Sequence, residues 1–161
     1  MMKRCFAALT AALLLLLCAC GGRSTAVSME DLRERMLAAA PSLPEMKSVD
    51  DSADNAEELF AYLSDMDYGK VEHFFLSYSA KGLADEIAVI AVKNAADAAA
   101  AQASLQSHLE GRKLLYEQYQ PDQLQRTESA EIFVKDQYAV LIVCDEVQAV
   151  KDAFRQAVAA N

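Results

Sequence analysis

The apolar positions near the start of the chain form one block instead of a periodic pattern. The run from Phe6 to Leu17 holds a single polar residue, and the basic pair Lys3 and Arg4 stands before it. At a helical rise of ~1.5 Å per residue, this run is too short to cross a ~30 Å hydrocarbon core. A basic start, a short apolar run and small residues after it are typical of a secretory signal peptide. We therefore predict that residues 1–19 are an export signal.

The apolar block ends in the tetrapeptide LCAC at residues 17–20, which has the form of a lipobox. The lipoprotein signal peptidase needs a small residue before the cut, here Ala19, and a cysteine after it, here Cys20. A diacylglyceryl thioether on Cys20, with palmitate-type chains, would supply two buried chains, enough for stable membrane anchoring. We expect the lipid to hold the protein at the outer face of the cytoplasmic membrane. The alternative is an ordinary signal peptide whose cysteines are incidental.

Helical spacing of apolar residues begins after a short tether, residues 20–28. Ser28 has the character of an N-cap, and Met29, Leu32, Met36 and Leu37 follow on one helical face. Two prolines then end this helix. The acidic stretch that follows, residues 45–58, is poor in apolar residues and predicts a loop that leads into a short helix at about 55–64.

The pattern then changes to strands in pairs, each pair followed by a helix. The pairs are residues 71–79 with 86–93 and residues 131–135 with 138–144, followed by helices at 95–119 and from Asp145 onward. We predict a single α+β domain over residues 29–161, with two N-terminal helices before a ββα-ββα order. The expected sheet has four antiparallel strands with the helices packed on one face.

Charge and cysteine content narrow the classes of partner. The chain has 15 basic and 24 acidic residues, a net charge of −9, and loss of residues 1–19 would make it more acidic still. Nucleic acid is therefore an unsuitable partner. Of the four cysteines, Cys5 and Cys18 fall within the signal, Cys20 would carry lipid, and Cys144 alone remains. The exported domain could form no internal disulfide and would depend on its core.

Several features together resemble a known family. They are the segment DEIAV at 85–89, Tyr119 followed by Pro-Asp-Gln at 121–123, and the YAVLIVCD strand that leads into the last helix. With the upstream lipobox and prolines, the chain from Leu32 to Val158 resembles a family of bacterial lipoproteins, domain of unknown function family 4358. The resemblance implies a lipid-anchored protein of Gram-positive, clostridia-like bacteria, and it supplies no catalytic residues. One departure is the second hairpin turn, Asp136-Gln137, where a Gly-Asn type is expected.

Candidate catalytic groups are few. Cys144 could pair with His73 or His108, the only histidines, to form a thiol nucleophile and its base. However, Cys144 ends a strongly apolar strand, which favours a small core residue. The sequence has no GxSxG, HExxH or CxxC motif and no glycine-rich phosphate loop. We therefore expect no cofactor and no enzyme activity.

Two further groups of residues suggest binding. Asp50 and Asp54 in the acidic loop are weak candidates for a calcium site, but Asn55 and Ala61 stand where an EF-hand loop requires glycine and glutamate. Asp85 and Glu86, before a strand, are expected to serve in the turn. A further set could line a surface groove, although packing under the helix end is the simpler interpretation: Tyr116, Tyr119 and Pro121.

The sequence leaves three hypotheses for function. The first is a non-catalytic, lipid-anchored module that binds an envelope protein or a small ligand. The second is a small envelope enzyme that uses Cys144 or a metal site in the acidic loop. The third is a purely structural spacer or surface-coat component.

Overall fold

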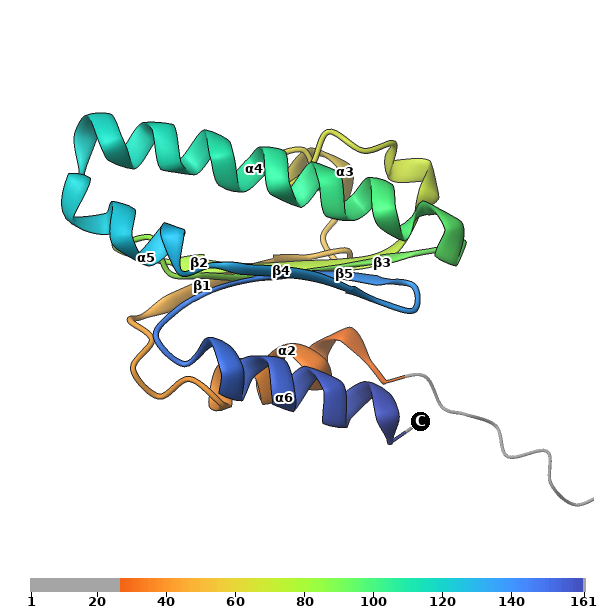
Figure 1. The fold of residues 1–161 in the computed structure, drawn as a ribbon. Coiled ribbons are helices and arrows are strands. Elements are labelled where there is room, and N and C mark those ends of the chain that lie inside the picture. The colour runs from red at the N-terminus through yellow and green to blue at the C-terminus, as the bar shows by residue number, and fades with distance from the viewer. Residues whose placement is uncertain (1–26, 161) are drawn as a thin grey trace, which may run out of the picture.

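The computed structural model describes residues 27–160, so the predicted signal peptide, the predicted Ala19-Cys20 cleavage site and Cys20, the predicted lipid attachment residue, lie outside the described residues. The described chain folds into three layers, with a five-stranded antiparallel sheet between two layers of helices (Figure 1). The elements in chain order are α2 (Met29–Ala38), β1 (Met46–Asp50), α3 (Ala56–Phe60), β2 (Val71–Ser79), β3 (Glu86–Val92), α4 (Ala98–Tyr119), α5 (Leu124–Glu128), β4 (Glu131–Lys135), β5 (Tyr138–Val143) and α6 (Val147–Ala159).

The sheet has the strand order β1-β2-β3-β5-β4. Both predicted hairpins are present, β2 with β3 and β4 with β5, and they join through the β3–β5 pair. The fifth strand, β1, corrects the sequence prediction of a loop at its position. This strand pairs only with β2. Its Val49 packs against the core, and the hydroxyl groups of Ser48 and Ser77 are hydrogen-bonded across the pair at 2.7 Å. An edge strand of this kind needs few apolar residues, so its sequence lacks the apolar pattern that predicts a strand.

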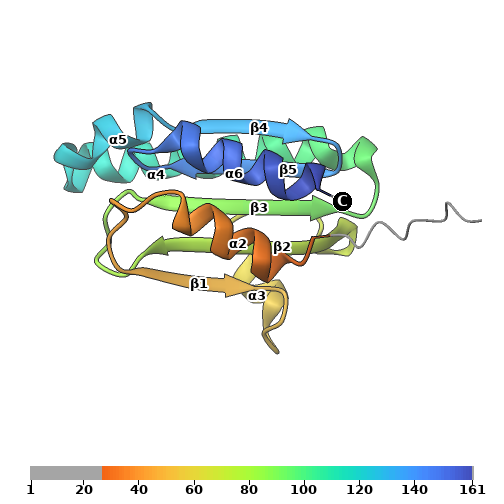
Figure 2. The same cartoon turned by 90° about the horizontal axis from the view of Figure 1, so that it is seen from below.

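Helices cover both faces of the sheet, which corrects the predicted single covered face. α3, α4 and α5 lie on one side, and α2 and α6 pack side by side on the other (Figures 1 and 2). Each side has its own apolar cluster. Leu105 of α4 packs with Ile90 and Leu141 on one face, whereas Phe154 of α6 packs with Val89 on the other. Every residue of β3 is buried, as expected for a strand that is covered on both sides.

Some helix caps and turns are as the sequence predicted, and others differ. Ser28 caps α2 as predicted, since its hydroxyl accepts a hydrogen bond from the amide of Asp31 at 3.1 Å. The predicted cap Asp145 does not cap α6; Glu146 holds that position, and Asp145 instead pairs with Arg126. In the β4–β5 turn, Asp136 takes a left-handed backbone conformation with φ 54°. This is the conformation for which glycine or asparagine is usually chosen.

Every described helix and strand and both apolar clusters lie within residues 27–160. A chain that begins at residue 20 with Cys20→Ser therefore keeps all of these elements and both apolar clusters. No helix among residues 27–160 is long and apolar enough to cross a bilayer.

Candidate functional site

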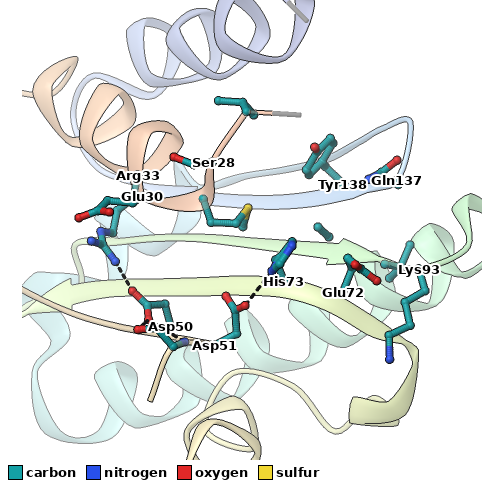
Figure 3. Close-up of a pocket in the computed structure, with 15 residues that line it drawn as sticks. Ser28, Glu30, Arg33, Asp50, Asp51, Glu72, His73, Lys93, Gln137 and Tyr138 are labelled. Atoms are coloured by element: carbon teal, nitrogen blue, oxygen red, sulfur yellow. Dashed lines mark hydrogen bonds and ion pairs between the residues drawn. The ribbon is translucent and has the colours of Figure 1, made fainter. Parts of the chain in front are cut away.

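A cavity of about 760 Å³ opens beside the first turn of α2, at one end of the sheet (Figure 3). We call it the α2 pocket. Its lining comes from α2 and the residues before it, the β1–α3 loop, and the ends of β2, β3 and β5: Val27, Ser28, Met29, Glu30, Arg33, Asp50, Asp51, Ser52, Glu72, His73, Ala91, Val92, Lys93, Gln137 and Tyr138.

The floor of the α2 pocket is a row of three residues across the sheet. His73 of β2 pairs with Ala91 of β3, and Ala91 pairs with Tyr138 of β5. The methyl group of Ala91 is far smaller than the rings on either side, and all three residues line the cavity. Tyr138 is held by an edge-to-face contact with Phe154, with ring centroids 5.7 Å apart. Burial and, after it, the charge of Asp136 raise the pKa of the Tyr138 hydroxyl, which keeps it protonated at neutral pH.

A β-bulge sets the direction of the residues at the end of β2. The pairing register shifts between Val71 and His73, so Glu72 is the extra residue. Because of the bulge, both Val71 and Phe74 contribute to the core on the α4 side, and His73 is left in the α2 pocket. Bulges often re-aim a side chain beside a functional site.

One hydrogen-bonded pair and one ion pair fix the polar wall of the pocket. Asp51 holds His73 through its carboxylate, with Oδ2 2.7 Å from Nδ1, and accepts a hydrogen bond from the Phe74 amide at 3.3 Å. Arg33 of α2 donates to Asp50 at the end of β1 (Figure 3). Ser52 first, and then Arg33, lower the pKa of Asp50, which keeps that carboxyl ionised.

The pocket carries an excess of negative charge. Four carboxylates line it, against the cations Arg33 and Lys93. Asp50 and Asp51 are paired as described, but Glu30 and Glu72 form no hydrogen bond or ion pair within residues 27–160. Lys93 is itself occupied, since its ammonium donates to the carbonyl of Gly69 at 2.8 Å. The pocket therefore favours a positively charged ligand.

The other sequence candidates are dispersed. His108 lies on the opposite face of the sheet, in contact with Glu86. Tyr116 is buried and donates a hydrogen bond to the Leu83 carbonyl at 2.9 Å, whereas Tyr119 is 69% exposed. These two tyrosines therefore share no common exposed surface. Asp85 and Glu86, predicted to serve in a turn, are both buried and ion-paired.

The acidic loop does not gather ligands for a metal. Asp50 is engaged by Arg33 and Ser52, and Asp54 is exposed. Within residues 27–160, no three His, Cys, Asp or Glu side chains come close enough to hold an ion together.

Cys144 lies in the apolar cluster under α2 and α6 and is only 2% exposed. The two histidines are engaged elsewhere, His73 with Asp51 and His108 with Glu86. Burial raises the pKa of the Cys144 thiol to about 11, against about 9 for a free thiol. The thiol is therefore protonated at neutral pH, which removes the nucleophilic form.

In a chain with Cys20→Ser that begins at residue 20, we expect native Cys144 to resist iodoacetamide at pH 7.5, because only about one thiol in three thousand is ionised. The same thiol should react fully in denaturant. Since its pKa is higher in the folded state, its contribution to stability is complete below pH 9 and is lost as the pH rises from 9 towards 11. Rapid stoichiometric labelling of the native protein, measured by mass spectrometry, would contradict this account of the thiol.

Of the comparisons with known proteins, the one with family models gives a match. No curated protein and no solved structure matches the chain. A family model, described as a domain of unknown function (DUF4358), matches residues 42–144. The match spans all five strands, whereas α2 and α6, which cover one face of the sheet, fall outside it. Because the match covers well over half of the sequence, the chain belongs to the DUF4358 family.

Proposed function

We propose that the protein is a lipid-anchored, extracytoplasmic binding protein that holds a small organic cation in the α2 pocket. The observation that carries the proposal is the cavity lined by His73 and Tyr138 and rimmed by carboxylates, of which two have no partner within residues 27–160. A cavity of about 760 Å³ is within the size range of small-molecule sites. The Tyr138 ring adds a face on which a cation can rest.

The lipid anchor, if formed on Cys20, would keep this pocket near the membrane. Six residues lie between Cys20 and Val27, and the seven Cα-to-Cα steps that join them span at most ~25 Å when fully extended. Val27, Ser28 and Met29 are themselves part of the pocket lining. An anchored protein would thus present the α2 pocket on the side from which its tether leaves.

The pocket suits binding better than catalysis. Its two serine hydroxyls are both engaged, since Ser28 accepts from the Asp31 amide and Ser52 donates to Asp50. The His73–Asp51 pair could move a proton, but neither serine hydroxyl is hydrogen-bonded to His73, so the pair has no serine nucleophile to activate. The enzyme hypothesis based on Cys144 or on a metal in the acidic loop gains no support from the burial of the thiol or from the Arg33–Asp50 pair.

Binding is tested with 1,4-diaminobutane as the probe, by calorimetry at low salt on the chain from residue 20 with Cys20→Ser. We expect saturable binding that weakens about fivefold in Glu72→Gln, because opposite charges about 4 Å apart interact by about 1 kcal/mol in water. Glu72 is exposed and unpaired, so its replacement should leave stability unchanged. The matched control is Glu117→Gln, an exposed carboxylate on α4, which should bind like the unmodified protein. Equal weakening by both variants, or no binding at all, would contradict the proposal.

Anchoring is tested by growing cells with labelled palmitate and separating membrane proteins by detergent phase partition. The full chain should carry the label and enter the detergent phase, and Cys20→Ser should do neither. Cys18→Ser is the matched control, since it alters the neighbouring cysteine and leaves the expected attachment atom in place. Label that persists in Cys20→Ser, or a full chain that stays in the aqueous phase, would refute the lipoprotein proposal.

A further inference from the structure

A second cavity, of about 370 Å³, lies on the other face of the sheet and is lined by residues of α3 and α4. We call it the Glu86 pocket. Its lining is mostly apolar or aromatic, with three polar groups at one side: Val49, Leu59, Tyr62, Leu76, Tyr78, Glu86, His108 and Arg112. None of these residues lines the α2 pocket.

The cavity exists because two helices of unequal length share this face. α4 packs over β3, β5 and β4, and it leaves the β1–β2 side to α3. α3 has five residues, whereas β2 below it has nine. The floor between the helices is formed by two rows of the sheet, Val49 beside Leu76 and Tyr78 beside Glu86. His108 and Arg112, one turn apart on α4, form the wall opposite Leu59 and Tyr62.

The carboxylate of Glu86 is the most unusual group in this cavity. The residue is 1% exposed, yet it stands among apolar side chains. One carboxylate oxygen, Oε1, lies 2.6 Å from Nε2 of His108. The other, Oε2, lies 3.1 Å from Nη1 of Arg112, but the two are not aligned as a hydrogen bond, and this buried oxygen has no hydrogen-bond donor within residues 27–160. A carboxylate oxygen has room for two donors, and a buried one without any is costly.

The charges around Glu86 are already balanced. Arg112 pairs with Glu86, and its other nitrogen donates to Tyr116 and to the Leu83 carbonyl. The Tyr116 hydroxyl donates to the same carbonyl, so this cation is held in place from three sides. With one carboxylate and one guanidinium in the lining, the Glu86 pocket does not call for a charged ligand. What it lacks is a donor for Oε2.

We propose that the Glu86 pocket binds an uncharged, largely apolar small molecule with one O–H or N–H group that donates to Glu86 Oε2, and that the side chains around this buried oxygen shift to admit the donor. The apolar body of the ligand lies against Leu59, Leu76 and the ring of Tyr78. Tyr62, which is 75% exposed, lies at the open side. This site differs from the α2 pocket in face, lining and ligand charge, so it does not rest on the proposed cation binding.

The test compares two probes that differ by one hydroxyl, 4-methylphenol and toluene. Each is titrated into the chain from residue 20 with Cys20→Ser, after thermal unfolding has shown a single cooperative transition, and amide NMR shifts are followed. We expect 4-methylphenol to shift amides of Val49, Leu76 and His108 in a saturable way. Toluene should bind there at least about tenfold more weakly, because it leaves Oε2 without a donor.

Three variants separate the ligand site from general effects. Glu86→Gln should bring the ratio of the two affinities close to one. Tyr62→Ala should weaken both probes while unfolding stays unchanged, since the side chain is exposed. Tyr119→Ala, an equally exposed tyrosine at the end of α4 and outside the lining, is the matched control and should change neither affinity.

Three results would overturn the proposal. The first is equal binding of the two probes, or no saturable binding of either, to the unmodified chain. The second is a set of shifts that falls on His73 and Tyr138 of the α2 pocket in place of the Glu86 pocket. The third is equal behaviour of Tyr62→Ala and Tyr119→Ala. If Glu86→Gln does not fold, the probe pair and the two tyrosine variants decide the matter. Diaminobutane binding is measured separately and is independent of all these outcomes.

Discussion

The burial of β3 and β5 on both faces is the constraint on which the rest of the structure depends. Strands without a polar face must be covered twice, and a chain of this length has only a few helices with which to do it. α4 covers β3 and β5 on one face of the sheet, and α2 and α6 together cover the other face. The cover is complete over the middle of the sheet and incomplete at its margins. Both pockets lie at those margins, one where α2 begins and one where α3 is too short.

Double burial also determines where the charged residues go. Asp85 directly precedes β3 and Glu86 is its first residue, and each is paired with an arginine from a distant element, Arg126 and Arg112 respectively. A buried carboxylate without such a partner would strongly destabilise the fold. The same pairs tie α4 and α5 to the β2–β3 hairpin. The side chains of Glu86 and Arg112 thus both stabilise the fold and form the polar side of the Glu86 pocket.

Much of the fold follows from sequence periodicity, and the exceptions have physical reasons. The spacing of Leu32 and Met36 predicts α2, and the paired apolar runs predict both hairpins. The two-sided cover was signalled by the unbroken apolar run of β3, which an alternating strand would not show. β1 gave no such signal, since an edge strand is held by backbone pairing to one neighbour and needs little apolar content.

The candidate sites were less visible than the fold. His73 was recognisable as one of two histidines, but its partner Asp51 and the bulge that places it depend on strand register. Glu86 and His108 are far apart in the sequence, and only the packing of α4 on β3 joins them. A cavity floor made of Ala91 between the rings of His73 and Tyr138 has no sequence signature. Such sites are products of packing, which local pattern does not encode.

Amide hydrogen exchange on the folded chain tests the central claim most directly. If the middle of the sheet is covered on both faces and its margins are not, amides of β3 and β5 should exchange slowest, through global unfolding alone. Exchange should be faster in β1 and around the bulge between Val71 and His73, beside the two pockets. Equal protection of β1 and β3, or local opening of β5 at rates like those of the edge strands, would contradict the account.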